Sequence, residues 1–134
     1  MQKNNLEFLQ PFTNAAGTLG FTPDIKSIPN IFTGKRFEGL GAFITNPISL
    51  RPRQPAKELN LIHYPGGFLL HTGFPNPGFS SVIKKYFSKW AVSRIPIIPH
   101  LLLDDSEEGQ GMVRKLEDLE NILSIEISFE PHMQ

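Results

Sequence analysis

Histidine side chains are the groups in this sequence best suited to proton transfer, because imidazole titrates near neutral pH. The 134 residues include four histidines and no cysteine. The lack of cysteine removes one class of nucleophile and base, and with it any thiolate metal site. His63 and His100 show no metal-ligand spacing, so we expect no metal site. His71 differs from them because glycine and proline surround it.

The stretch that contains His71, residues 66–78, reads GGFLLHTGFPNPG. Its four glycines and two prolines would be costly inside a helix, and it is too apolar for a solvated linker. Glycine allows close backbone approach, and proline fixes the turns around it. The pattern predicts a buried, rigid loop shaped to fit against a flat partner. A tight connection between two strands is the alternative interpretation.

Strands and helices alternate along the rest of the chain. The expected elements are a short strand or hairpin ending near Phe12, a helical turn at 23–28, a strand at 42–45 closed by an Asn46-Pro47 turn, a helix with its apolar face from Val82 to Trp90, a strand at 95–103, a helix capped by Asp104, and a strand at 124–129. Such alternation predicts parallel strands with crossover helices. Ligands bind at the carboxyl edge of such sheets.

Composition and charge exclude several other classes of protein. Forty per cent hydrophobic and 19% charged residues describe one soluble globular domain. Thirteen basic residues balance thirteen acidic ones, so no field points to nucleic acid or an anionic membrane. The longest apolar run, 97–103, is interrupted by Pro99 and His100 and cannot span a bilayer. Without a signal peptide or cysteine, the default location is cytoplasmic.

Four segments resemble motifs of the dihydroorotate dehydrogenase family. Residues 14–20, NAAGTLG, resemble the family's A-[AS]-G-T-x-G loop after the first strand. Residues 41–53 resemble its second strand and the segment beyond. Residues 66–78 resemble G-G-M-L-N-x-x-G-L-x-N-P-G, and Ile125-Glu126-Ile127 resembles the opening of I-E-L-N-x-S-C-P-N. The four segments occur in the family's order at compatible spacing, which makes the resemblance specific.

The resemblance implies a fold and an overall size. The family is an FMN-dependent (β/α)8 TIM barrel of pyrimidine synthesis, and a barrel of this class needs about 250 residues. We therefore expect residues 1–134 to be the N-terminal half of a barrel domain, with about four βα units. Three explanations of a half barrel stay open. The chain is part of a longer product, two copies close one barrel as a homodimer, or the chain is a remnant without function.

The resemblance also implies a cofactor site. Ala15, Ala16 and Gly17 have almost no side chain, so the planar ring of FMN could approach their backbone closely. Thr45 and Asn46 would complete the cofactor-binding set at the end of the second strand. A tight strand-to-helix turn at Ala-Ala-Gly is the competing interpretation.

The substrate side departs from the family pattern. Leu70, Gly73 and Asn76 stand at positions that would face substrate, but Leu70 replaces the family's asparagine and Asn46 replaces its lysine. The motif after the last strand lacks the cysteine or serine base, and Ser128 stands where the family has its asparagine. His71 is the candidate catalytic residue, with Glu130 and His132 as further candidates. A histidine packed in an apolar loop is the alternative for His71.

These changes predict an FMN-dependent oxidoreductase that is not specific for dihydroorotate. It would transfer hydride between a small substrate and flavin, in CH–CH oxidation, while a base takes a proton. The alternative function is a non-catalytic protein that binds flavin, another ligand or a partner and keeps the fold without the chemistry.

Overall fold

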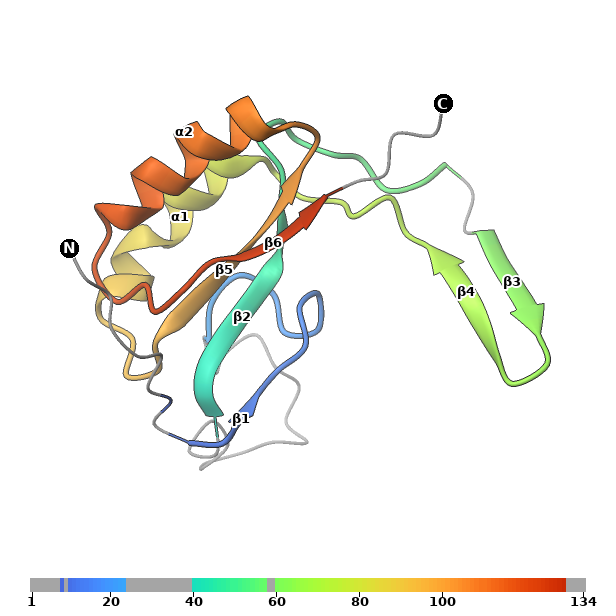
Figure 1. Ribbon diagram of the computed structural model, residues 1–134, viewed down its shortest axis with the longest axis horizontal. Coiled ribbons are helices and arrows are strands. Elements are labelled where there is room, and N and C mark those ends of the chain that lie inside the picture. Colours follow the sequence, from blue (N-terminus) through green and yellow to red (C-terminus); the bar gives the residue numbers. More distant parts are fainter. Residues whose placement is uncertain (1–7, 9, 24–39, 58–59, 130–134) are drawn as a thin grey trace.

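A parallel sheet forms the body of the protein. The computed structural model describes residues 8, 10–23, 40–57 and 60–129. The sheet order is β1 (Phe12–Thr13), β2 (Leu40–Ile48), β5 (Ile97–Leu103) and β6 (Glu126–Phe129), and every neighbouring pair is parallel. The sheet curls into a half barrel (Figure 1). This confirms the predicted α/β class and a partial (β/α) barrel, while the helical turn predicted at 23–28 lies outside the described residues.

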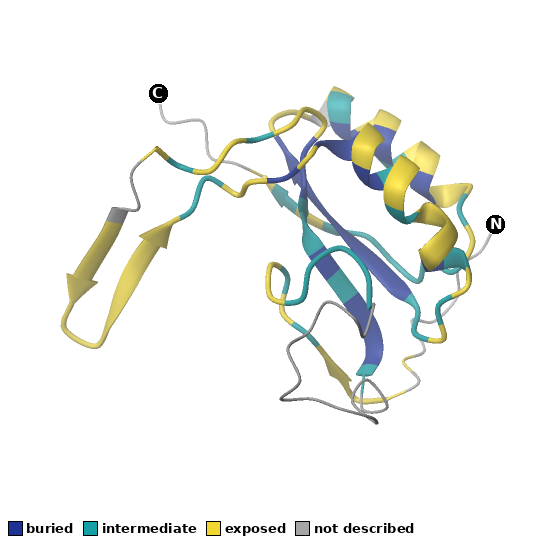
Figure 2. Cartoon of the chain, turned by 180° about the vertical axis from the view of Figure 1, so that it is seen from behind, coloured by how far each residue is buried: buried dark blue, intermediate teal, exposed yellow. Residues whose placement is uncertain are grey.

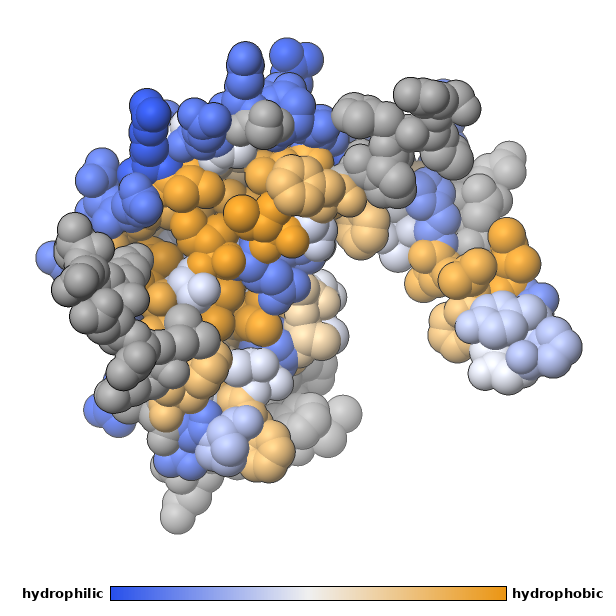
Figure 3. Space-filling model, in the orientation of Figure 1, coloured by the Kyte–Doolittle hydropathy of each residue, from blue (hydrophilic) through white to orange (hydrophobic). Residues whose placement is uncertain are grey.

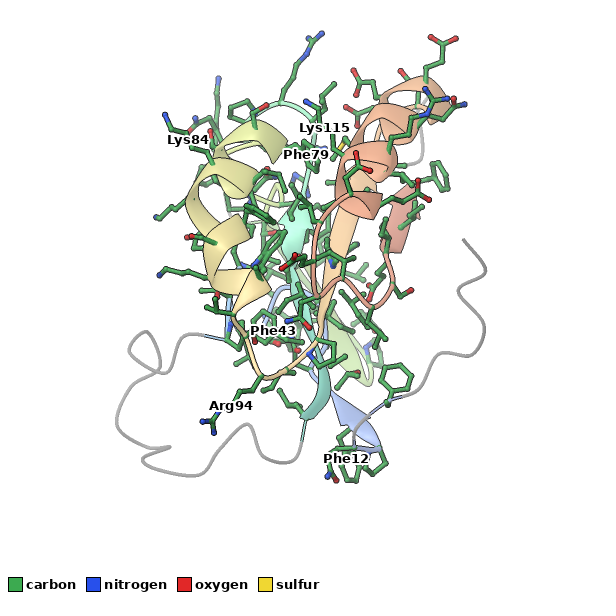
Figure 4. The ribbon with its side chains drawn as sticks, turned by 90° about the vertical axis from the view of Figure 1, so that its left-hand side faces the viewer. Phe12, Phe43, Phe79, Lys84, Arg94 and Lys115 are labelled. Carbon is green, nitrogen blue, oxygen red and sulfur yellow. The ribbon has the colours of Figure 1, made fainter. Side chains whose placement is uncertain are left out.

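Two helices cover one face of the sheet, as Figures 1 and 4 show. They are α1 (Phe79–Ala91), which links β2 to β5 after an excursion, and α2 (Ser106–Glu117), which links β5 to β6. Alternate residues of β5 join the core beneath them, namely Ile97, Leu101 and Leu103. The remaining buried core residues come from β2 and the two helices: Phe43, Ile48, Phe79, Val82, Trp90, Met112 and Leu116.

Helix α1 has the amphipathic face that its sequence predicts. Val82 and Trp90 are fully buried, whereas Lys84 points into solvent (Figure 4). Trp90 Nε1 donates a hydrogen bond of 2.7 Å to the backbone oxygen of Phe21, and the Phe21 ring stacks on Tyr86 with centroids 5.5 Å apart. The helix therefore binds the segment that follows β1 as well as the sheet.

Helix α2 begins one residue later than predicted. Its N-cap is Asp105, whose carboxylate accepts a hydrogen bond of 2.8 Å from the backbone N–H of Glu108. The predicted cap, Asp104, instead lies 3.7 Å from Arg53 as an ion pair. Two adjacent aspartates suit the cap equally well by residue type, and the structure engages the first with Arg53 and uses the second as the cap. Gly109 permits close packing here, since a Cβ would lie 2.6 Å from the Leu103 side chain.

The turn predicted at Asn46-Pro47 is wrong, because both residues lie inside β2. Ile44 pairs with Ile98 and Pro47 pairs with His100, so two residues of β2 stand opposite one of β5. This is a β-bulge, and a bulge is where a strand tolerates proline. The bulge keeps β2 in the sheet and changes which side chains it presents beside the 14–20 loop.

The buried loop predicted for residues 66–78 is wrong for its first half. Residues 67–71 form the strand β4 (Gly67–His71), which pairs antiparallel with β3 (Asn60–Tyr64). Pro65 and Gly66 make the turn, and the positive φ of 97° at Gly66 suits a turn with proline before glycine. Figure 2 shows this hairpin exposed and extended away from the sheet, and Figure 3 shows hydrophobic side chains gathered on it.

The second half of the same stretch packs closely against the chain. Gly73 and Gly78 both have positive φ, of 76° and 82°. A Cβ on Gly73 would lie 2.7 Å from the backbone nitrogen of Ala56, and one on Gly78 would lie 2.9 Å from that of Pro52. These glycines are needed for both conformation and space. Residues 73–78 therefore form a rigid connection between the hairpin and α1.

Candidate functional site

The 14–20 loop is held against β2 by the side chain of Asn14. Asn14 Oδ1 accepts a hydrogen bond of 2.8 Å from the backbone N–H of Ile44, and its Nδ2 donates one of 2.7 Å to the Ile44 oxygen. The amide thus binds both backbone groups of one residue, as a neighbouring strand would. It extends the β1–β2 pairing by a side chain and fixes where the loop begins.

Asn46 holds the other end of this loop. Its backbone N–H donates to the oxygen of Gly20 at 2.7 Å, and its Oδ1 accepts from the Gly20 N–H at 3.0 Å. The two asparagines therefore anchor the loop at both ends on one strand. Asn46 was a predicted cofactor residue, whereas Asn14 was not singled out, because its anchoring role depends on the register of β2.

Between these anchors the loop presents backbone with little side chain. Ala15 and Gly17 are exposed and Ala16 is half-buried. Gly17 has φ of 80°, and the nearest atom to a Cβ there would be Pro47 Cδ at 3.9 Å. Thr18 Oγ1 donates to the Ala15 oxygen at 2.6 Å and closes the turn. A flat ring can approach such a surface closely, so these residues fit the isoalloxazine of FMN.

Thr45 lies inside the sheet rather than on this surface. It is fully buried, and its hydroxyl donates to the Asn46 oxygen at 2.9 Å while accepting from the His100 N–H at 3.0 Å. This hydroxyl bridges β2 and β5 at the bulge. No part of Thr45 is exposed here, and its cofactor role stays a prediction.

The predicted substrate residues divide between the hairpin and the packed connection. Leu70 and His71 belong to the exposed strand β4. Gly73 packs on the backbone at Ala56. Asn76 is buried and binds the chain itself, with Ser49 as its main partner. The structure brings Gly73 and Asn76 together in one connection and places Leu70 and His71 on the hairpin. Their roles toward a substrate or catalysis stay predictions.

A cluster of polar side chains lies on the sheet face opposite the helices. His100 alternates along β5 with the residues of the helix-side core, so it points to the other face. Its Nε2 lies 2.9 Å from Ser128 Oγ, and its Nδ1 lies 3.8 Å from Glu126 Oε1. His100 pairs in register with Glu126 across β5 and β6, which accounts for the proximity. Sequence spacing did not reveal this cluster, because 26 positions separate the two residues.

Burial makes His100 harder to protonate. Removal from water lowers its pKa from the ordinary value of 6.5, and the nearby Glu126 carboxylate opposes this by raising it. The groups facing its ring are Glu126 and the Ser128 hydroxyl from β6, while Thr45 of β2 meets its backbone. The imidazole is therefore neutral at neutral pH.

This pKa shift predicts a loss of stability in mild acid. The unfolded chain binds a proton at His100 below about pH 6.5, whereas the folded chain resists it, so the free energy of unfolding falls as pH falls from 6.5 through the folded pKa. The slope from one proton is at most about 1.4 kcal/mol per pH unit. Urea titrations across this range should show the slope reduced in His100→Gln and retained in His63→Gln, an exposed control. Equal slopes in wild type and His100→Gln would contradict the assignment.

Two further kinds of site are absent from the described residues. No group of three or more histidine, aspartate or glutamate side chains is arranged there to hold a metal ion. None of the helices in those ranges has the length and apolar character needed to cross a membrane.

Known proteins are similar to this chain over nearly its whole length. The profile of the family described as dihydroorotate dehydrogenase matches residues 2–133. The catalytic subunit of dihydroorotate dehydrogenase B (NAD(+)) from Methanocaldococcus jannaschii is 31% identical over 98% of this chain and 43% of its own length. The subunits of the same name from Maridesulfovibrio salexigens and Pelobacter propionicus are 26% and 25% identical, each over 92% of this chain and 38% of its own length.

The chain thus spans about two fifths of the length of these curated relatives. The profile match covers nearly all of it, and the curled parallel sheet has the architecture that the four motifs imply. These observations together show that the chain belongs to the dihydroorotate dehydrogenase family.

Proposed function

We propose that this chain contributes to an FMN-dependent oxidoreductase of the dihydroorotate dehydrogenase kind, and that residues 1–134 are the N-terminal half of its barrel domain. The observation that carries the proposal is the 14–20 loop, anchored at both ends on β2 by Asn14 and Asn46. The exposed backbone of Ala15 and Gly17 between the anchors suits a flat cofactor.

In this proposal Ala15, Ala16 and Gly17 form the floor against which the flavin ring lies, with Asn46 at its edge. Thr45 supports Asn46 from inside the sheet, through the hydrogen bond to its backbone oxygen. Bound FMN would supply the acceptor for hydride from a small substrate. The asparagine anchors keep the floor in place, so the cofactor meets a surface that needs little ordering on binding. Asn46 stands where the family has lysine, which supports a substrate other than dihydroorotate.

Adding bulk to the floor tests this proposal. We expect the purified 134-residue chain to bind FMN and Ala15→Leu to weaken binding at least tenfold, because the leucine side chain would occupy the ring's place. Gly111→Leu adds bulk at an exposed position of α2, where a Cβ would have nothing within 4 Å, and it should bind FMN as wild type does. Quenching of FMN fluorescence during titration measures all three dissociation constants.

The outcomes of this titration separate the candidate functions. A wild-type chain that takes up no FMN, or an Ala15→Leu chain that binds it equally well, would contradict the proposed site. Binding of FMN without its reduction by dihydropyrimidines or other reductants would favour the non-catalytic alternative. One observation supports this alternative: Asn46 stands in place of a cationic side chain, and its amide oxygen is bound to Gly20.

A further inference from the structure

Three side chains on the sheet face opposite the helices have an arrangement suited to moving a proton. His100 is 7% exposed, and its Nε2 lies within hydrogen-bond distance of Ser128 Oγ at 2.9 Å. Its Nδ1 is buried without a hydrogen-bond partner, and the closest acid is Glu126, 3.8 Å away. A hydroxyl, an imidazole and a carboxylate thus follow one another in space.

The unpartnered Nδ1 indicates which of the two ring nitrogens of His100 carries the proton. A buried polar atom without a partner is costly, and the carboxylate of Glu126 is an acceptor that a small rotation of either side chain would bring within reach. A proton on Nδ1 satisfies this pairing and leaves Nε2 as an acceptor for the Ser128 hydroxyl. The same ordering of groups lets imidazole serve as a base in enzymes that activate a hydroxyl.

Both helices of the described residues cover one face of the sheet, and the three residues lie toward its other face. His100 lies on β5, Ser128 and Glu126 lie on β6, and β5 places its helix-facing core residues at the alternate positions. Pro47 of β2 pairs in register with His100, and Gly17 of the cofactor floor is close to Pro47. A substrate lying on the floor would therefore be near this face. Ser128 is partly exposed whereas His100 is buried, so a substrate could meet the hydroxyl before the imidazole.

We propose that Ser128, His100 and Glu126 form a proton-transfer group that serves the flavin site. The inference rests on the proposed function, and it supplies the base that the family motif lacks in this chain. A C–H bond of a small substrate would break with its proton passing to Ser128 Oγ, whose own proton passes to His100 Nε2. The electron pair left on carbon would form a C=C bond as the neighbouring carbon loses hydride, for which bound FMN would supply the acceptor. Glu126 stabilises the imidazolium that results.

Nitrogen NMR of the purified chain tests the arrangement without any cofactor. The ¹⁵N shifts of His100 identify the protonated ring nitrogen, and we expect a proton on Nδ1 and none on Nε2 at neutral pH. Ser128→Ala should shift Nε2, and Glu126→Gln should lower the pKa of His100 further, since the carboxylate raises it. His63 serves as the internal reference, because it is exposed on the hairpin. A proton on Nε2 would overturn the proposal, because Ser128 would then have no acceptor for its own proton.

A second measurement follows the chemistry in FMN-loaded protein. Dihydroorotate and other dihydropyrimidines are the probes, and the observable is the rate at which the most active of them bleaches the wild-type flavin absorbance. A wild-type protein that none of them bleaches would overturn the proposal. We expect Ser128→Ala and His100→Gln to slow bleaching at least 100-fold with FMN affinity unchanged, and His63→Gln to match wild type. Bleaching of Ser128→Ala at the wild-type rate would overturn the proposal. A chain that takes up no FMN would refute the proposed function instead, and the protonated nitrogen of His100 would still decide this inference.

Discussion

Replacing Trp90 by alanine is expected to lower the free energy of unfolding by about 3–5 kcal/mol. The indole is fully buried between α1 and the sheet, so its removal leaves a cavity in the core. Its Nε1 also donates to the Phe21 oxygen at 2.7 Å, the bond that ties the segment after β1 to the helix. Both losses act on the elements that carry the 14–20 loop.

Two matched variants separate these contributions. Trp90→Phe removes the hydrogen-bond donor and only part of the buried volume, and we expect it to cost less than Trp90→Ala. Phe87→Ala removes an aromatic ring that is 37% exposed on the same helix and should cost less still. Urea unfolding followed by circular dichroism measures all three. A cost for Trp90→Ala below that for Phe87→Ala would contradict the assigned core.

Replacing Asn76 by alanine is expected to lower the free energy of unfolding by about 2–4 kcal/mol, because several buried polar groups would lose their hydrogen-bond partner. Asn76 Oδ1 accepts from the N–H groups of Ser49 and Gly78 at 3.3 and 3.0 Å. Its Nδ2 donates to Ser49 Oγ at 2.9 Å and to the Phe74 oxygen at 3.0 Å. These bonds join the end of β2 to the start of α1, which has no side-chain cap of its own.

The control for Asn76 is an amide that makes no such bonds. Gln110 is exposed on α2, and its replacement by alanine should change stability by less than about 0.5 kcal/mol. Chemical denaturation of the two variants in parallel provides the comparison. An Asn76→Ala chain as stable as Gln110→Ala would show that the hydrogen bonds of Asn76 do not stabilise the connection between β2 and α1.

Local pattern predicted the helices and the parallel strands because those elements follow from periodicity. The apolar face of α1 is spaced for a helix, and β5 is a short apolar run bounded by other elements. The hairpin was missed because its strands are exposed on both sides and rich in apolar residues, which is the composition of a buried segment. The bulge at Asn46-Pro47 was missed because its cause is pairing with β5, which sequence alone does not specify.

The candidate site was predictable to the extent that it depends on backbone. The small residues Ala15, Ala16 and Gly17 indicate close approach by their type alone. The roles of Asn14 and His100 could not be predicted from the sequence, because they arise from long-range contacts. Asn14 meets Ile44 thirty positions along the chain, and His100 meets Ser128 twenty-eight positions along. Residue type suggested neither contact.

The most direct test of the central claim is to map FMN onto the chain by NMR. In ¹H–¹⁵N spectra of the purified protein, FMN should shift the amide signals of Ala15, Ala16, Gly17 and Asn46 in a saturable way. The signals of Gly109 and Met112 on α2, on the opposite face of the sheet, should stay unchanged. Saturable shifts confined to the 14–20 loop and the end of β2 are the predicted result. Spectra that FMN leaves unchanged, or shifts confined to α2, would contradict the account.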